Sequence, residues 1–215
     1  MITVVGNLKG GSGKSTVTFN LAIWLAVRGQ DVVTFDLDPQ ATLSDVVEVR
    51  NEEEYEPVVS VYRTESDPLK ILRKHQGQAL VDVGASNMWA MSQAISLADR
   101  VLVPVAPSQA DVWSTQRFLN IVKEAVAERP QGKAPPEILG FINRADTHHA
   151  VRETEEAEEA LGTLPGMTVL NKRLGQRTSF RRSFSEGLAV FELEPTGKAA
   201  SEFAEFALTL YPQLG

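Results

Sequence analysis

Short, continuously apolar runs alternate with longer helix-like segments along this 215-residue chain. The expected strands are Ile2–Val5, Asp31–Phe35, Val58–Tyr62, Ala79–Asp82, Arg100–Val105, Ile138–Ile142 and Met167–Leu170. The expected helices are Ser15–Arg28, Ala41–Val47, Asp67–His75, Met88–Leu97, Asp111–Glu128, Arg152–Leu161, Thr178–Glu186 and Thr196–Tyr211. Strands that are apolar on both faces are typical of a parallel sheet with helices on both sides. The sequence therefore predicts one α/β domain over residues 1–215, with a mostly parallel twisted sheet.

Composition and charge exclude several classes of protein. The chain has no cysteine, which excludes a disulfide scaffold and thiolate metal sites. With 21 Lys and Arg against 28 Asp and Glu, it is acidic, so any nucleic-acid binding must come from a local basic patch. No apolar run approaches the length of a membrane span and the first residues lack a signal-peptide pattern. We therefore expect a soluble, cytoplasmic protein.

A glycine-rich segment joins the first expected strand to the first expected helix. Its glycines allow successive backbone N–H groups to point at phosphate oxygens, and the helix N-terminus adds partial positive charge. Lys14 could reach the β- and γ-phosphates, and the Ser15 hydroxyl could ligate Mg²⁺. The expected nucleotide-binding residues are Gly10, Gly11, Ser12, Gly13, Lys14, Ser15 and Thr16. The alternative, a glycine-rich turn without a ligand, leaves Lys9 and Lys14 unexplained.

Several segments resemble motifs of the ParA/MinD ATPases. Residues 9–16 are similar to the deviant Walker A box, residues 35–40 to the second motif in its ParA form, and Val81-Asp82 to Walker B. The segments 103–108 and 187–192 also resemble that family, so the likeness runs the whole length of the chain. The resemblance implies a P-loop NTPase fold of the deviant Walker A class, ATP and Mg²⁺ as cofactors, and slow hydrolysis of ATP to ADP and phosphate.

Three aspartates follow or end expected strands. Asp36 and Asp38 lie two residues apart and would share a face, where carboxylates can position water and hold a metal's water shell. The resemblance implies that Asp38 organises the hydrolytic water and that Asp36 lies on the metal side. Asp82 ends an apolar strand beside the phosphate loop, where a charged residue is otherwise costly, so we expect it to hold Mg²⁺ through a water. The alternative is that one of the first two only caps the following turn. Gly84-Ala85 depart from the proline or glycine pair usual in the family.

Two further residues are assigned through the resemblance. Lys9, at the mouth of the loop, would reach the phosphates of a second copy, so that two ATP molecules lie within a homodimer. It would then be catalytic and nucleotide-binding, acting with Lys14 and Asp38. Asn143 follows the expected strand Ile138–Ile142, at the edge where ligands bind in open α/β sheets, and the resemblance places it near the adenine. The alternative for Asn143 is an ordinary polar loop.

A basic cluster stands out near the end of this acidic chain. It comprises Lys172, Arg173, Arg177, Arg181 and Arg182. Such a cluster can neutralise phosphates without reading bases, and the resemblance implies non-specific DNA binding and nucleoid association. The alternatives are that these residues pair with the acidic helix around 153–159 or line a dimer edge.

The resemblance as a whole implies a positioning ATPase of the small ParA class, with no helix-turn-helix domain before the first strand. Such a protein segregates plasmid or chromosome DNA, or spaces another large cargo, and a ParB-like or other cargo adaptor stimulates its hydrolysis. One alternative is a MinD-like membrane ATPase, which requires a basic amphipathic C-terminal helix. Glu202 and Glu205 supply the charge of the last helix and its phenylalanines suit a core, so we expect no membrane binding. Another alternative is an ATP-dependent ligase on the same scaffold.

Overall fold

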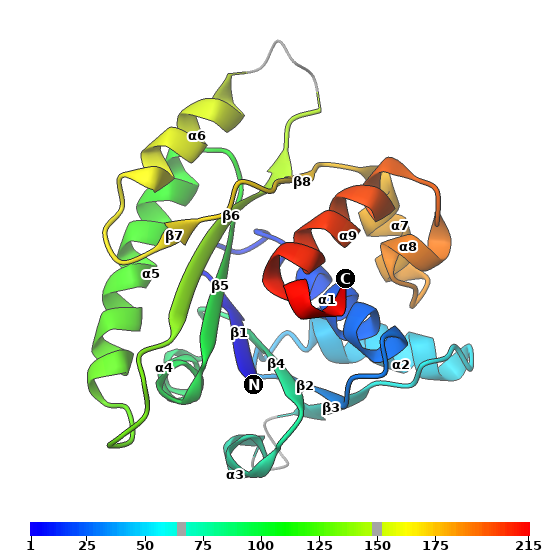
Figure 1. The fold of residues 1–215 in the computed structure, drawn as a ribbon, viewed down its shortest axis with the longest axis horizontal. Helices are drawn as coiled ribbons and strands as arrows, with labels where there is room; N and C mark the ends of the chain where they lie inside the picture. Colours follow the sequence, from blue (N-terminus) through cyan, green and yellow to red (C-terminus); the bar gives the residue numbers. More distant parts are fainter. Residues whose placement is uncertain (64–67, 148–151) are drawn as a thin grey trace.

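The computed structural model describes residues 1–63, 68–147 and 152–215, and these form a parallel sheet with helices on both faces (Figure 1). The strands are β1 (Ile2–Gly6), β2 (Val32–Asp36), β3 (Ser60–Arg63), β4 (Gln78–Val83), β5 (Arg100–Val105), β6 (Glu137–Ala145), β7 (Thr168–Val169) and β8 (Leu174–Gly175). Their order is β3-β2-β4-β1-β5-β6-β7, with β8 also beside β6, and every pair is parallel. The predicted fold class is confirmed.

Two layers of helices cover the sheet and build two cores (Figure 1). One layer contains α3 (Pro68–Lys74), α4 (Met88–Leu97), α5 (Gln109–Ala127) and α6 (Glu153–Gly162). The other contains α1 (Lys14–Val27), α2 (Thr42–Glu52), α7 (Thr178–Ser185), α8 (Val190–Leu193) and α9 (Lys198–Leu210), followed by a 3₁₀ turn at Pro212–Leu214. Because the carboxyl ends of parallel strands share one edge, the loops after β1, β2, β4 and β5 meet there.

The interpretation of the last helix as a core element is confirmed. Phe203 and Phe206 are completely buried and Leu210 is nearly so, while Glu205 faces solvent. The apolar side of α9 is therefore occupied by the protein's own core. None of the helices in the described parts of the chain combines the length and the apolar character needed to cross a membrane.

Some expected boundaries were wrong. Helix α2 continues to Glu52, five residues beyond the expected helix end at Val47. Strand β6 extends to Ala145, so Asn143 lies within a strand and not after it. The two-residue β8 and the four-residue α8 are too short to produce a periodic signal. The predicted helix start at Asp67 lies outside the described residues.

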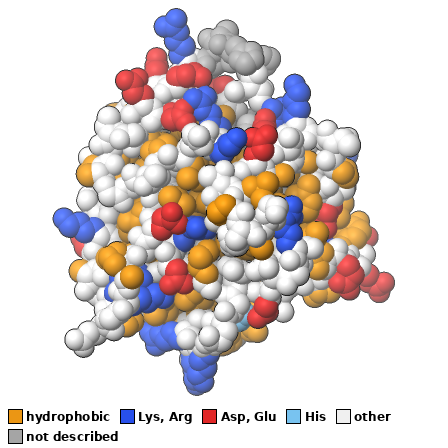
Figure 2. All heavy atoms as spheres, viewed as in Figure 1, with side chains coloured by type: hydrophobic (Ala, Val, Ile, Leu, Met, Phe, Trp, Pro, Cys, Tyr) orange, Lys and Arg blue, Asp and Glu red, His pale blue; other side chains and the backbone are white. Residues whose placement is uncertain are grey.

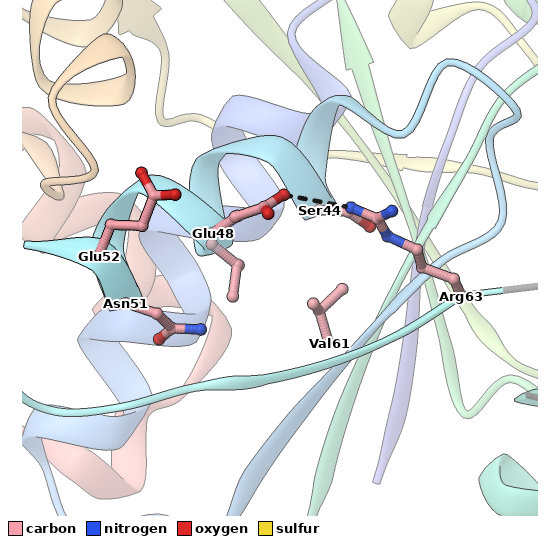
Figure 3. Close-up of a pocket in the computed structure, with 7 residues that line it drawn as sticks. Ser44, Glu48, Asn51, Glu52, Val61 and Arg63 are labelled. Carbon is pink, nitrogen blue, oxygen red and sulfur yellow. Dashed lines mark ion pairs between the residues drawn. The ribbon is translucent and has the colours of Figure 1, made fainter.

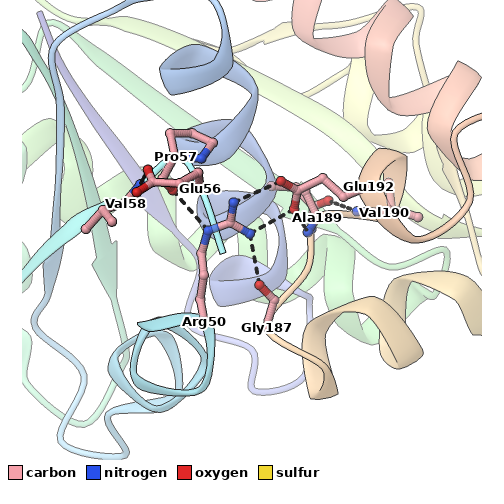
Figure 4. Close-up of polar contacts among 9 residues, drawn as sticks. Arg50, Glu56, Pro57, Val58, Gly187, Ala189, Val190 and Glu192 are labelled. Carbon is pink, nitrogen blue, oxygen red and sulfur yellow. Dashed lines mark hydrogen bonds and ion pairs between the residues drawn. The ribbon is translucent and has the colours of Figure 1, made fainter. Parts of the chain in front are cut away.

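A buried arginine explains why α2 is longer than expected. The Arg50 side chain is fully buried and forms an ion pair of 2.8 Å with Glu192 (Figure 4). Its guanidinium also donates to the carbonyl oxygens of Gly187 and Pro57, at 3.0 and 3.1 Å. Because an unpaired buried charge is strongly unfavourable, this network holds the last turn of α2 against the segment that joins α7 to α8.

Candidate nucleotide-binding site

The glycine-rich loop lies at the carboxyl end of β1, the strand between β4 and β5. Gly11 and Gly13 have φ angles of 77° and 89°, in the left-handed region that favours glycine. No atom lies within 4 Å of a Cβ placed on Gly10 or Gly11, so space is open on that side of the loop. Residues 14–27 then form α1, whose N-terminus faces this space. The loop therefore has the shape and the helix dipole of a phosphate cradle.

The two lysines of the loop occupy different environments. Lys14 is only 9% exposed, and its Nζ donates to the carbonyl oxygen of Lys9 at 3.2 Å. Burial lowers the pKa of Lys14, while the charges of Asp82 and Asp38 oppose this shift. The Lys9 side chain is exposed to solvent. Lys14 is thus placed to serve its own site, whereas Lys9 is open to solvent.

Asp82 ends the apolar strand β4 beside the loop and is 1% exposed. Neither of its carboxylate oxygens has a hydrogen-bond partner within the described residues. Burial raises the pKa of Asp82 to about 7, although the nearby Ser15 hydroxyl and Lys14 charge favour the ionised form. An unpartnered buried carboxylate beside a serine hydroxyl provides the hard oxygen donors that Mg²⁺ prefers. Asp82 and Ser15 therefore fit a magnesium site.

The carboxylates of Asp36 and Asp38 have separate roles in the structure. Asp36 is buried and accepts hydrogen bonds from the backbone N–H and hydroxyl of Ser44, at 2.8 and 2.9 Å. Burial raises the pKa of Asp36, and the bonds from Ser44 oppose that rise. Because Ser44 is the third residue of α2, Asp36 satisfies a backbone N–H in the first turn of that helix, as the capping alternative expects. Its predicted place beside a metal stays a prediction.

Asp38 lies farther out and faces the loop that follows β4. Its Oδ1 accepts hydrogen bonds from the Ser86 hydroxyl at 3.0 Å and from the Gln40 backbone N–H at 3.1 Å. Its side chain is half-buried, and its charge acts on both Lys14 and Asp82. Asp38 therefore keeps an accessible carboxylate on the same side of the loop as the unpartnered oxygens of Asp82.

The Asp38 carboxylate packs directly against the backbone of Gly84. A Cβ at Gly84 would clash with the Asp38 carboxyl group. If Asp38 orients the hydrolytic water as predicted, Gly84→Ala is expected to reduce ATP turnover by about 100-fold, because a misplaced catalytic group costs that much, while ATP affinity changes little. Gly162→Ala is the matched control, since no atom lies within 4 Å of its added methyl group. Single-turnover hydrolysis and equilibrium ATP binding separate the two effects; normal turnover in Gly84→Ala would contradict the positioning of Asp38.

Asn143 links the loop to the neighbouring strand β6. Its Nδ2 donates to the Ser12 carbonyl oxygen at 2.7 Å, and it leaves no room for a side chain at Gly13. A cavity of about 350 Å³ begins at these residues and extends between α1 and α7. Its walls include Thr16, Arg144 and the four successive residues Gly175, Gln176, Arg177 and Thr178, with Phe180, Arg181 and Phe184 beyond. This cavity adjoins the phosphate cradle, where the base and ribose of a nucleotide would extend.

A second hollow, of about 490 Å³, lies between α2 and the edge strand β3 (Figure 3). Glu48 and Glu52 line it together with Arg63, which pairs with Glu48 at 3.8 Å. Acidic side chains do not suit a triphosphate, and the residues of the glycine-rich loop do not line this hollow. Figure 2 shows acidic side chains gathered at the edge of the molecule where Figure 1 places the end of α2.

The sequence interpretation missed two supports of the site. Asn7 is completely buried, and its amide donates to the Pro104 carbonyl and the Thr115 hydroxyl, at 3.0 and 3.3 Å. It also accepts from the Lys9 backbone N–H at 3.3 Å, which anchors the start of the loop. Ser86 is the other missed support. A lone amide directly after an apolar strand was the available signal for Asn7, whereas Ser86 offered none.

The basic cluster is largely paired. Two of its members form ion pairs with α9: Lys172 with Glu205 at 2.7 Å, and Arg177 with Glu202. Arg173 pairs with two glutamates of α6, Glu155 at 3.1 Å and Glu158. Arg182 lies 3.6 Å from Glu194. The alternative pairing with the acidic helix α6 is thus confirmed for Arg173. Arg181 is exposed and has no ion pair within the described residues. On the face shown in Figure 2, basic side chains are interspersed with acidic ones.

Comparisons with known proteins agree with this geometry. Residues 3–190 match the CobQ/CobB/MinD/ParA nucleotide binding domain. The chain is 30% identical over 203 residues to the maintenance of carboxysome distribution protein A of Halothiobacillus neapolitanus, covering 92% of this chain and 90% of that protein. It is 27% identical over 220 residues to protein ParA of Rhizobium radiobacter, covering 99% and 97%. The septum site-determining protein MinD of Pyrococcus horikoshii, solved with Mg-ADP, superposes with a TM-score of 0.72 at 18% identity, covering 97% of this chain and 95% of that one.

Proposed function

The chain belongs to the CobQ/CobB/MinD/ParA family of nucleotide-binding domains, and we propose that it is a positioning ATPase of the ParA type that dimerises around ATP. Proteins of the ParA/MinD family are ATPases, and those of the ParA type generally dimerise on ATP and act with partner proteins. The observation that carries the proposal is the pair of lysines in one loop. Lys14 is buried at its own site and Lys9 is exposed at the mouth. An exposed lysine at a phosphate site suits a second subunit's nucleotide.

The chemistry follows from the positions of the side chains. The Lys14 ammonium would bind the β- and γ-phosphates, and the Ser15 hydroxyl and the Asp82 carboxylate would hold Mg²⁺. When bound, Mg²⁺ neutralises charge on the phosphate oxygens. Asp38 accepts a hydrogen bond from the attacking water and orients it toward the γ-phosphate. Asp36 shapes this arrangement because its Oδ1 accepts from the Asp38 backbone N–H at 3.2 Å.

The cargo is proposed from the kind of relatives the chain has. One relative is named for maintaining carboxysome distribution and another is a ParA, so both point to the placement of a large object. We infer that a ParB-like or other adaptor on that cargo stimulates hydrolysis in this protein. Hydrolysis removes the γ-phosphate that both subunits contact, so the dimer dissociates and each subunit can bind ATP again.

Light scattering with size-exclusion chromatography tests the dimer directly. With Mg²⁺ and a non-hydrolysable ATP analogue, the measured mass is expected to double from the 23.5 kDa of one chain, and with Mg-ADP it is expected to stay there. The physical reason is that only the triphosphate offers a group that Lys14 of one subunit and Lys9 of the other can share. A single-chain mass at saturating analogue would contradict the proposed function.

We further propose that the dimer binds DNA without sequence preference through the basic cluster, with Arg181 as its least compensated charge. The double change Arg181→Glu and Arg182→Glu is expected to weaken DNA binding on the order of 10-fold or more at ~0.1 M salt, and to flatten the salt dependence. The double change Lys70→Glu and Lys123→Glu, on α3 and α5, is the matched control, because it makes the same charge change on the opposite helical layer. Fluorescence anisotropy with a random-sequence duplex measures both. If the double arginine variant binds the duplex at low salt as tightly as the wild type, the basic cluster is not the DNA-binding surface.

A further inference from the structure

Two large aromatic side chains are exposed on this protein. Of the three tryptophans, Trp24 is 1% exposed, whereas Trp89 is 68% and Trp113 is 56% exposed. Met88, beside Trp89, is 42% exposed. Exposed side chains of this size are unfavourable in water and mark interaction surfaces when they occur together.

Both tryptophans are carried by segments that contact the phosphate loop or its supports. Helices α4 and α5 follow β4 and β5, the two strands that flank β1; both begin at the carboxyl edge of the sheet, and they pack against each other. Trp89 lies three residues after Ser86, which hydrogen-bonds Asp38 at 3.0 Å. Trp113 immediately precedes Ser114 and Thr115, whose hydroxyls lie 3.5 and 3.3 Å from the polar side-chain atoms of Asn7.

Few charges accompany this patch. Residues 84–98 and 106–116 contain no lysine or arginine, and their exposed polar residues include Ser86, Gln109 and Gln116. The exposed Arg117 follows one helical turn after Trp113 on α5. A membrane-binding face would carry several basic residues beside its apolar ones. An aromatic centre with a polar rim is instead typical of a protein–protein interface. Because the two halves of a twofold interface are the same surface, a patch with an uncharged centre can face its own copy without repulsion.

We infer that Met88, Trp89 and Trp113 are the apolar anchors through which a second copy of this chain docks when both copies hold ATP. This inference rests on the proposed function, since Lys9 can reach the partner's phosphates only if the surface around the loop is brought against the partner. At about 250 Å² for a whole tryptophan, the two exposed fractions correspond to roughly 300 Å² per subunit. A typical stable interface takes about 800 Å² from each partner. Buried tryptophans are also frequent hot spots of binding.

Alanine substitution tests the anchors. Trp89→Ala and Trp113→Ala are each expected to weaken ATP-dependent dimerisation at least ~10-fold, measured by sedimentation with Mg²⁺ and a non-hydrolysable ATP analogue. ATP affinity of the dilute monomer is expected to stay within about twofold, which shows that the variants fold. Val27→Ala is the matched control: Val27 is 55% exposed but ends α1, at the opposite end from the phosphate loop.

Fluorescence supplies a readout that does not depend on removing the anchor. In the Trp113→Phe protein, emission is expected to shift to shorter wavelength when the ATP analogue is added, and not with ADP, because Trp89 leaves water while Trp24 is already buried. If the wild type dimerises while both alanine variants dimerise equally well, this inference is overturned and the proposed function stands. If the wild type does not dimerise, both fail. A shift caused by phosphatidylglycerol vesicles without nucleotide would overturn the inference in favour of a membrane.

Discussion

Lys14→Ala is expected to lose ATP binding, whereas Lys9→Ala is expected to bind ATP as a monomer. Hydrogen bonds to charged groups contribute about 1.5–3 kcal/mol each, so loss of contacts to two phosphates lowers ATP affinity by about 100-fold or more. Lys9 faces solvent in its own subunit, so its removal should change monomer affinity by less than about threefold. Calorimetry measures the affinities, and light scattering with the ATP analogue measures the mass.

The two lysines lie only five residues apart, so a difference between the two variants reports on the position of each side chain and not on a different region of the protein. Lys198→Ala, an exposed lysine that begins α9, controls for the loss of one positive charge. An ATP-dependent dimer of Lys9→Ala with wild-type stability would contradict the role of Lys9 across the interface. Retained ATP affinity in Lys14→Ala would remove the nucleotide site from this loop.

Asp82→Asn is expected to stabilise the protein at pH 8 in the absence of nucleotide and metal, although it removes Mg²⁺-dependent ATP turnover. Burial raises the pKa of Asp82 to about 7, whereas an unfolded aspartate titrates near ~3.9. Between those values the folded state binds a proton that the unfolded state has lost, so this group's contribution to stability falls as pH rises from about 4 to about 7. Asparagine carries no charge, so the folded variant avoids the few kcal/mol of unfolding free energy that the buried, ionised Asp82 carboxylate costs at pH 8.

Thermal unfolding at pH 5 and pH 8 measures this effect. The gain from Asp82→Asn should be largest at pH 8 and small at pH 5. Asp99→Asn is the control of opposite sign: burial raises its pKa, but the Ile2 N–H and Lys133 outweigh burial and lower it, so removing this charge should slightly destabilise the protein at pH 8. Equal melting temperatures of Asp82→Asn and wild type at pH 8 would show that the buried carboxylate carries no such cost.

The parts of the fold that were predicted well depend on local pattern. The bounds of β5 and α4 agree with the prediction because an apolar strand run and an apolar helix follow clear breaks in the sequence. The end of α2 could not be predicted, since Arg50 is stabilised in the interior by Glu192, 142 residues further along the chain. Local propensity carries no information about such a partner.

In the candidate site too, local sequence predicted some features, while others depend on contacts between distant segments. Lys14, Ser15 and Asp82 were predicted from the glycine-rich loop and from a carboxylate at the end of an apolar strand. The hydrogen-bond partners of Asp36 and Asp38 were not predicted, because Ser44 and Ser86 reach them from separate segments. Asn143 was predicted near the base, and its hydrogen bond to Ser12 became visible only in the folded chain.

By itself, the sequence determined the parallel α/β architecture and the phosphate loop, because strand and helix periodicity and the spacing of residues 9–16 are local properties of the chain. Only the tertiary structure decided which charged side chains remain unpaired and which apolar side chains remain exposed to solvent. Arg173 is neutralised by glutamates of α6, Trp24 is enclosed by the core, and Trp89 is left in water. Burial and ion pairing depend on contacts between distant segments, and these contacts exist only after the chain has folded.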